Sequence, residues 1–304
     1  MTRDRGVVLI NALVIVLVIS SVAAALLTRA EGARVRSAHV HGATQAGLYL
    51  DAAEALLPAL LAGIVEAGEV VHPGQPWGQG QRSYRIDRGQ VTATMTDLQG
   101  RLNVNWLANP DDVYALETFQ RLFNDIGLPV SLLGNIADFV GPDGPRDINS
   151  YLGAPVRVQP RGGPVKLLEE LRHVTGMTPE YFGVFEQYVS ALPFETRLNL
   201  NTAQDPVLRA VLEPFPEEQV TDFFADRDDG PIMALSDFRN RTIEILETED
   251  IEYLPFDKLT VTSFWFDARM RAELSGKNWK RHAILFRDTQ AELVRVAYRW
   301  AVFD

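Results

Sequence analysis

The residues best suited to chemistry are six aspartates that lie beside glycine–proline pairs. They form two groups: Asp138, Asp143 and Asp147, and then Asp226, Asp228 and Asp229. Carboxylate oxygens gathered on a loop are the ligands that a hard cation such as calcium prefers. Neither group fits the register of the EF-hand calcium loop, and an acidic loop is more often simply solvated. The six aspartates are therefore candidate calcium ligands, with a solvated loop as the alternative.

Residue types exclude several other kinds of site. The chain of 304 residues has no cysteine, which excludes thiolate metal sites, disulfides and cysteine nucleophiles. Its five histidines lie in unrelated segments, and His39 and His41 are too close in sequence to share one face of a helix. We find neither a nucleophile elbow nor a phosphate-binding glycine loop. The sequence therefore predicts a protein that is not an enzyme.

The charge is concentrated in the middle of the chain. The net charge is -11, and residues 106–254 alone hold 26 acidic and 11 basic side chains. Such a field repels the phosphate backbone of nucleic acids. We therefore expect no nucleic-acid partner.

The first element that positions these residues is a long apolar run near the N terminus. Residues 7–27 contain no charged side chain. A helix of this length covers about 31 Å at about 1.5 Å per residue, which matches the hydrocarbon core of a bilayer. The alternative, a secretory signal peptide, has a shorter apolar stretch of roughly 7–15 residues. The run therefore predicts the transmembrane part of an N-terminal helix that crosses the membrane once.

The helical pattern continues beyond the apolar run. Apolar residues recur at every fourth position, at Leu48, Ala52, Leu56, Leu60 and Ile64. Glycines and prolines follow from Gly63 onward and end the pattern. We therefore expect one helix over about 7–65, with its first half in lipid and its second half packed on a globular domain.

Strand patterns flank a helical middle section. Residues 84–96 alternate around the turn Asp87-Arg88-Gly89, which predicts a hairpin. Alternation returns from Leu259, with a turn at residues 275–278. Its apolar face is predicted to consist of Phe264, Phe266, Ala268, Met270, Ala272 and Leu274. Val294, Val296, Tyr298, Trp300 and Val302 are predicted to form one face of a last strand.

These patterns predict an α+β fold: a long N-terminal helix packed on an antiparallel sheet, with a large all-α domain inserted between strands, an arrangement that resembles a pilin-like fold. Residues 1–6 form a leader and 7–27 the transmembrane part. The pilin-like domain occupies 28–105 and 255–304, and 106–254 form the insert. Within the insert, 165–174 and 179–192 have helical patterns.

A short motif occurs twice. Residues 101–105 read RLNVN and residues 197–201 read RLNLN, and each copy is followed by a helical stretch and an acidic loop. Two asparagines around one apolar residue suit an extended turn that caps the next helix, which is more often a structural role than a catalytic one. The insert is therefore predicted to be a duplicated helical module.

The junction between leader and helix resembles that of type IV pilin-like proteins, since a short charged leader ends in Gly6 directly before the apolar run. Ordinary pilins carry glutamate at the fifth mature position, where this chain has Asn11. That departure is characteristic of the K-type minor pseudopilins of type II secretion. Residues 97–105, 170–180, 198–203 and 263–266 are also similar to that family, so the resemblance covers nearly the whole chain.

The resemblance implies processing, partners and location. A prepilin peptidase would cut between Gly6 and Val7 and methylate Val7. Asn11 would replace the pilin glutamate at a filament tip, where no subunit lies above. The head would lie in the periplasm on an inner-membrane anchor, cap the pseudopilus and help to start its assembly. The implied partners are the I-type and J-type minor pseudopilins in a tip complex and the major pseudopilin filament, with calcium bound in the helical domain.

One alternative function is a membrane-anchored DNA-binding protein. Residues 199–203 and the helices after them also resemble a helix-hairpin-helix repeat, which approaches phosphate through a glycine-rich hairpin. In the comparable place this chain has residues 213–218, which read EPFPEE. The prolines lack N–H donors and the glutamates repel phosphate, so the sequence disfavours DNA binding.

Overall fold

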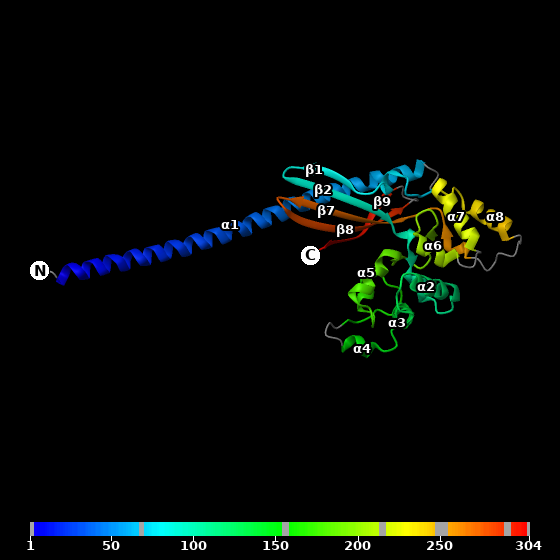
Figure 1. The fold of residues 1–304 in the computed structure, drawn as a ribbon, viewed down its shortest axis with the longest axis horizontal. Coiled ribbons are helices and arrows are strands. Elements are labelled where there is room, and N and C mark those ends of the chain that lie inside the picture. The colour runs from blue at the N-terminus through cyan, green and yellow to red at the C-terminus, as the bar shows by residue number, and fades with distance from the viewer. Residues whose placement is uncertain are drawn as a thin grey trace.

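One helix dominates the N-terminal part of the fold. The computed structural model describes residues 3–66, 70–153, 158–212, 217–246, 255–288 and 293–302. Helix α1 (Arg3–Glu66) is continuous over 64 residues, as the apolar run and the pattern after it predicted. Figure 1 shows its first half standing clear of the rest of the molecule and its second half lying along the sheet.

The sheet has five strands in the order β1-β2-β7-β8-β9, and every neighbouring pair is antiparallel. The strands are β1 (Arg82–Ile86), β2 (Gly89–Asp97), β7 (Trp265–Leu274), β8 (Lys277–Asp288) and β9 (Leu293–Val302). The predicted hairpin at residues 84–96 is confirmed as β1 and β2. Arg88, at the turn, has a positive φ of 61°. The insert separates β2 from β7 in the sequence, whereas the two strands are neighbours in the sheet.

The apolar face of β7 is confirmed. Phe266, Ala268, Met270, Ala272 and Leu274 are buried together with residues of β2 and β8, whereas Phe264 lies just before the strand and is half-buried. Alternation along this strand therefore predicted its inner face correctly.

The prediction for the last strand was wrong in one respect. The pairing of β8 with β9 shifts between Ile284 and Leu285, so that Val296 pairs with Leu285 and Tyr298 with Ile284. Ala297 is the extra residue of a bulge, and a one-residue insertion moves all later side chains to the other face. Val294 and Val296 therefore lie on the helix side of the sheet, whereas Tyr298, Trp300 and Val302 lie on the opposite, outer side.

The second half of α1 packs on the sheet, as predicted, through one of its two apolar rows. The buried helix residues are Ala46, Leu50, Leu57 and Leu61, and they share a core with β2, β7 and β8. Leu48 and Leu56, from the predicted row, remain 59% and 55% exposed. Both rows have helical spacing, and only the position of the sheet decides which one is buried.

Ion pairs reinforce this packing at the β8–β9 side. Arg281 Nη1 of β8 lies 2.5 Å from Asp51 Oδ1 and 3.4 Å from Glu54 Oε2 of α1. Arg299 Nη1 of β9 lies 3.3 Å from Glu54 Oε1. Two strands are therefore tied to the same turn of the helix.

The insert is mainly helical, as predicted. Its helices are α2 (Val113–Asp125), α3 (Val130–Val140), α4 (Ile148–Leu152), α5 (Pro179–Tyr188), α6 (Asp205–Leu212), α7 (Glu217–Asp229) and α8 (Leu235–Leu246). The expected helix at 165–174 is reduced to a 3-10 helix, η4 (Leu168–His173), and the one at 179–192 ends at Tyr188.

Two hydrophobic cores divide the molecule. One joins α1 to the five-stranded sheet, and the other fills the insert around Phe119, Phe123, Phe182 and Phe185. Figure 1 shows the insert helices around the end of the sheet that is far from the N terminus. The insert is therefore a second body at the distal end of the pilin-like part.

Candidate functional site

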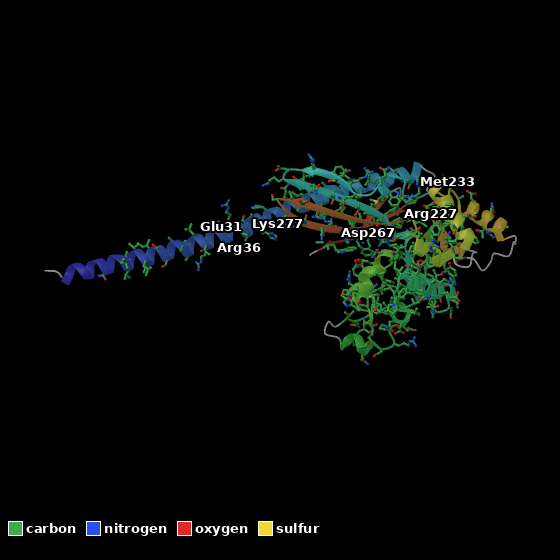
Figure 2. The ribbon with its side chains drawn as sticks, in the orientation of Figure 1. Glu31, Arg36, Arg227, Met233, Asp267 and Lys277 are labelled. Atoms are coloured by element: carbon green, nitrogen blue, oxygen red, sulfur yellow. The ribbon has the colours of Figure 1, made fainter. Side chains whose placement is uncertain are left out.

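The first candidate site is the free half of α1. Among the described residues, one helix is long and apolar enough to cross a membrane, and none of its most apolar 18-residue stretch is buried. In Figure 2, Glu31 and Arg36 lie on the part of α1 that stands clear of the sheet, and Lys277 lies at the near end of the sheet. An apolar surface of this kind has to be covered by lipid or by other helices.

The predicted processing residues lie on this helix. Gly6 and Val7 belong to α1, but the surroundings of these two residues lie outside the described part, so cleavage between them and methylation of Val7 stay predictions. Asn11 is exposed and carries no charge. An amide inside hydrocarbon can hydrogen-bond to another helix, but it cannot form the ion pair that a carboxylate would form.

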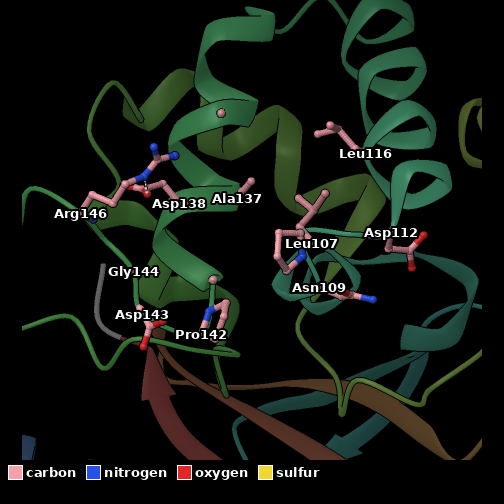
Figure 3. A pocket seen from close by; sticks show the side chains of 13 residues that line it. Leu107, Asn109, Asp112, Leu116, Ala137, Asp138, Pro142, Asp143, Gly144 and Arg146 are labelled. Carbon is pink, nitrogen blue, oxygen red and sulfur yellow. Dashed lines mark hydrogen bonds and ion pairs between the residues drawn. The ribbon is translucent and has the colours of Figure 1, made fainter.

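The first aspartate group starts inside a helix rather than a loop. Asp138 belongs to α3, and its two carboxylate oxygens accept hydrogen bonds from Arg146: Nε donates to Oδ1 at 2.7 Å and the backbone N–H donates to Oδ2 at 3.1 Å. Asp143 and Asp147 are exposed. Figure 3 shows Arg146 against Asp138, with Asp143 farther along the loop. The charge of Asp138 is therefore already neutralised within the loop.

The second aspartate group is helical as well. Asp226, Asp228 and Asp229 belong to α7, which corrects the prediction of an acidic loop, and their side chains lie outside the described part. Among the described side chains, no three histidine or acidic residues are grouped closely enough to hold a metal ion. The described aspartates therefore do not assemble a calcium site in this conformation, and the six calcium ligands stay predictions.

A cavity of about 470 Å³ lies beside the first aspartate group. Asp138 and Arg146 line one side of it and Leu107 and Asp112 the other (Figure 3). Asp112 is itself paired, because Lys258 Nζ lies 2.5 Å from its Oδ2. The cavity is thus lined by three aspartates, Asp112, Asp138 and Asp143, and ion pairs with Lys258 and Arg146 engage the first two of them.

The first copy of the repeated motif is structural, as predicted. Asn103 caps η3 (Val104–Ala108) by accepting a hydrogen bond from the N–H of Asn105 at 3.2 Å. Its side-chain amide also accepts from the N–H of Leu192 at 3.1 Å and donates to the carbonyl of Pro193 at 2.9 Å. Asn105 donates to the carbonyl of Val165 at 2.8 Å and accepts from its N–H at 2.9 Å. The first copy therefore fixes loops within the insert.

The second copy repeats this geometry with different partners. Asn199 accepts from the N–H of Asn201 at 3.0 Å, and Asn201 both donates to the carbonyl of Ile232 at 3.0 Å and accepts from its N–H at 2.8 Å. The amide of Asn199 reaches out of the insert, donating to Val71 O at 3.0 Å and to Ser263 Oγ at 2.9 Å. The second copy therefore joins the insert to the pilin-like part.

Asp97 is the centre of this junction. It stands at the end of β2, and its Oδ2 accepts from Ser263 Oγ at 2.5 Å and Thr202 Oγ1 at 2.6 Å. Its Oδ1 accepts from the N–H of Gln99 at 2.8 Å. Burial raises the pKa of Asp97 above its usual 3.8, although these hydrogen bonds act in the opposite direction. The carboxyl group therefore links β2, the second motif and the segment that leads into β7.

Sequence reasoning found part of this network. The motif residues were identified, but Ser263, Val165 and Ile232 were not assigned to them, because their positions in the sequence have no fixed spacing from either copy. Thr202 directly follows the second copy, but nothing in the sequence assigned its hydroxyl group to Asp97. Each copy also opens with a two-residue parallel pairing: β3 (Leu102–Asn103) with β4 (Val189–Ser190), and β5 (Leu198–Asn199) with β6 (Leu259–Thr260). This common geometry supports the predicted duplication.

These features define a class. A long helix with a free apolar half, whose second half packs on an antiparallel sheet, is the architecture of a pilin-like protein, and here a helical domain interrupts the sheet. A family model described as "Type II secretion system (T2SS), protein K" matches residues 100–194. Type II secretion system protein K of Pseudomonas aeruginosa is 30% identical over 244 residues, which cover 72% of each chain. The chain belongs to the family of type II secretion system protein K, and it is a minor pseudopilin.

Other relatives agree with this assignment. The Klebsiella pneumoniae protein of the same name is 28% identical over 71% of this chain and 72% of its own length. The Aeromonas hydrophila protein is 25% identical and covers 96% of both chains. All are secretion-system components, and they give no support to the DNA-binding alternative.

A solved structure confirms the fold. A chain from the crystal structure of the GspK-GspI-GspJ complex of enterotoxigenic Escherichia coli superposes with a TM-score of 0.69 and 20% sequence identity. The match covers 88% of this chain and 100% of that chain. The predicted α+β fold, with its long N-terminal helix, antiparallel sheet and helical insert, is therefore confirmed.

Proposed function

We propose that this minor pseudopilin caps the tip of a periplasmic pseudopilus and helps to start its assembly, in a complex with I-type and J-type minor pseudopilins and above the major pseudopilin. Its anchor would cross the inner membrane once, with the head in the periplasm. The proposed role is mechanical, based on packing, and includes no catalysis.

One observation carries this proposal: α1 has a free apolar half that is continuous with a half packed on the head. Lipid covers such a surface before assembly, and neighbouring apolar helices can replace lipid without a large loss of burial. The same helix therefore serves first as an anchor and then as the part that joins a helical bundle.

The place of the insert supports a position at the tip. It lies at the distal end of the sheet (Figure 1). A subunit stacked on that end would have to occupy the space that the insert fills. Asn11 agrees with this position, because it lacks the charge with which a pilin glutamate pairs to a neighbouring amino terminus.

Co-purification from membranes tests the complex. The full-length chain with an affinity tag should recover the I-type and J-type pseudopilins together. It should also recover some major pseudopilin, but less than a tagged subunit from within the filament would recover. Replacing Asn11 with glutamate should reduce recovery, because an unpaired carboxylate in hydrocarbon is costly; Asn11→Gln is the matched control. Equal recovery with Asn11→Glu would contradict the tip assignment.

We also propose processing by prepilin peptidase between Gly6 and Val7, followed by methylation of Val7. Mass spectrometry of the mature N terminus tests this step. The expected N-terminal residue is methylated Val7, and an intact Met1 in cells that contain the peptidase would refute it. Replacing Gly6 with a bulky residue should block the cut.

Calcium binding is proposed from the sequence and the family resemblance, with Asp138, Asp143, Asp147, Asp226, Asp228 and Asp229 as the candidate ligands. Thermal unfolding of the chelator-treated chain with and without added calcium tests it, because a ligand that binds only the folded state raises the Tm. Magnesium is the control cation. A Tm that responds to neither chelator nor calcium would refute the proposal.

A further inference from the structure

The two edges of the five-stranded sheet differ in length and in exposed side chains. Strand β1, at one edge, has five residues, whereas β9, at the other edge, has ten. No other described strand pairs with the outer edge of β9. A strand edge presents a row of N–H and C=O groups, and only another extended backbone can match their spacing.

Strand β9 also has little of the usual protection of an edge. Proteins protect edges with short strands, prolines or charged side chains, and β9 is long and contains no proline. Its two arginines are engaged elsewhere: Arg295 pairs with Asp288 at 2.6 Å, and Arg299 pairs with Glu54. Leu293, Val296 and Tyr298 are 42%, 43% and 38% exposed. The edge therefore combines exposed apolar side chains with two arginines that already have acidic partners within the fold, and no described strand pairs with it.

A groove runs along the outer face of the sheet beside this edge. It consists of two cavities of about 450 and 270 Å³, which share Ile284 of β8 and Ala191 of the insert. Tyr298, Trp300 and Val302 of β9 line it. These three residues lie on the outer face only because of the bulge at Ala297, so the bulge places an aromatic row in the groove.

The groove is apolar at one end and mixed in charge at the other. Pro164, Val165, Leu192 and Pro193 of the insert face Trp265, Ile284 and Tyr298 of the sheet at the apolar end. Arg101, Arg172, Arg269, Glu169, Glu186 and Asp267 line the other end. Arg269 pairs with Asp267 at 2.8 Å and Arg172 with Glu186 at 3.8 Å, so the charges largely balance. This surface does not select a strongly charged ligand.

We propose that an extended segment of another polypeptide adds to the outer edge of β9 and places alternate side chains in this groove. Main-chain hydrogen bonds to the edge would supply much of the affinity, and the aromatic row would select apolar side chains at every second position. Tyr298 to Val302 spans about 13 Å at about 3.3 Å per residue, which is enough for three alternate side chains. The insert stands over the outer face here, which favours a single strand over the edge of a second folded sheet.

This binding site goes beyond the tip role and does not depend on it. Helix α1 covers the other face of the sheet. A segment bound in the groove would therefore leave the packing surface of α1 free, and the chain could hold the segment and its filament partners at the same time.

Peptide binding to the full-length chain in detergent tests the proposal. The probe is a fluorescent ten-residue peptide of alternating valine and threonine with a lysine at each end. Its control is the same peptide with a methyl group on every backbone nitrogen, which removes the N–H donors of both edges and keeps the side chains. The first peptide should raise the fluorescence anisotropy and the methylated one should not. Equal binding of both, or of neither, would overturn the proposal.

Two tyrosines provide matched variants, because Tyr298 and Tyr84 lie on the opposite edge strands and are 38% and 48% exposed. Tyr298→Ala should weaken peptide binding about tenfold, as expected for an aromatic anchor, and Tyr84→Ala should leave it unchanged. Equal weakening in both variants would overturn the assignment to β9. Hydrogen exchange in the unaltered chain provides an independent measure, since amides of residues 293–302 should become protected by the peptide.

Self-association is the competing use of the same edge. Sedimentation at several concentrations measures it without the peptide. A monomer in detergent agrees with the proposal, whereas a dimer that Tyr298→Ala dissociates would assign the edge to a second copy of this chain and overturn the proposal.

Discussion

The two copies of the repeated motif have the same local geometry and hold different parts of the molecule together. In each copy the first asparagine caps the following turn and the second binds both backbone groups of one distant residue, Val165 or Ile232. The remaining bonds differ, since Asn103 stays within the insert whereas Asn199 reaches Val71 and Ser263. The two copies therefore share one local geometry, and only the second connects the insert to the pilin-like part.

Asp97→Ala should have the largest effect on this comparison, because it removes a partner that only the second copy uses. Ser263, Thr202 and Gln99 would each lose a buried acceptor. Leaving several buried donors unpaired should lower the free energy of unfolding by about 4 kcal/mol. Urea unfolding of the full-length chain in detergent measures it. A loss below about 1 kcal/mol would mean that the carboxyl group does not hold the junction.

The two asparagines should differ in where they loosen the fold rather than in how much. Asn199 and Asn103 are both buried, and alanine at either position should cost about 3 kcal/mol. Hydrogen exchange distinguishes them. Asn199→Ala should speed the exchange of the backbone amides of residues 70–77 and 259–264, and Asn103→Ala should speed that of residues 189–194. The same pattern in both variants would show that the division between the copies is wrong.

The pH dependence of Asp97 should give a smaller effect. Because burial raises its pKa, the folded chain binds the proton more tightly than the unfolded chain does. Its contribution to stability is therefore greatest at low pH and is lost as the pH rises above 3.8 through the folded pKa. The other titratable groups contribute equally to the natural chain and to Asp97→Asn, so their contributions cancel in the difference between the two unfolding midpoints. This difference should shift in favour of Asp97→Asn as the pH rises, and a constant difference would contradict the raised pKa.

The arginines that open the two copies should give the smallest effect. Arg101 is half-buried and donates to the carbonyl of Glu186 at 2.9 Å, whereas the side chain of Arg197 is exposed. Arg101→Ala should cost about 1 kcal/mol and Arg197→Ala close to nothing. Equal losses, measured by the same urea midpoint, would mean that the side chain of Arg197 has a role that its exposure does not suggest.

Periodic patterns predicted most of the elements. The long helix, the first hairpin and the inner face of β7 were correct, because hydrophobic spacing and turn residues determine such features locally. The sequence did not identify the helix face that packs on the sheet, since α1 carries two apolar rows and the choice between them depends on a distant element. The face of Tyr298 was predicted wrongly, because the bulge at Ala297 leaves no signal in the alternation.

The candidate site could be predicted only in part. The aspartates were recognised by type, but the bond from Arg146 to Asp138 is set by the way the loop folds back on α3. The motif asparagines were given a structural role correctly, yet nothing in their spacing distinguished the copy that binds the sheet from the copy that does not. Side-chain partners separated by many residues depend on the completed fold.

The sequence by itself determined the apolar anchor, the length of α1, the acidic insert and the family, because each of these follows from local composition or from ordered motifs. The tertiary structure alone decided which row of α1 is buried, which copy of the motif joins the two bodies, and which face of β9 carries its aromatic residues. The physical reason is that these choices arise from contacts between distant segments, in which one-residue shifts of register and the position of a neighbouring sheet select among local patterns that are equally favourable.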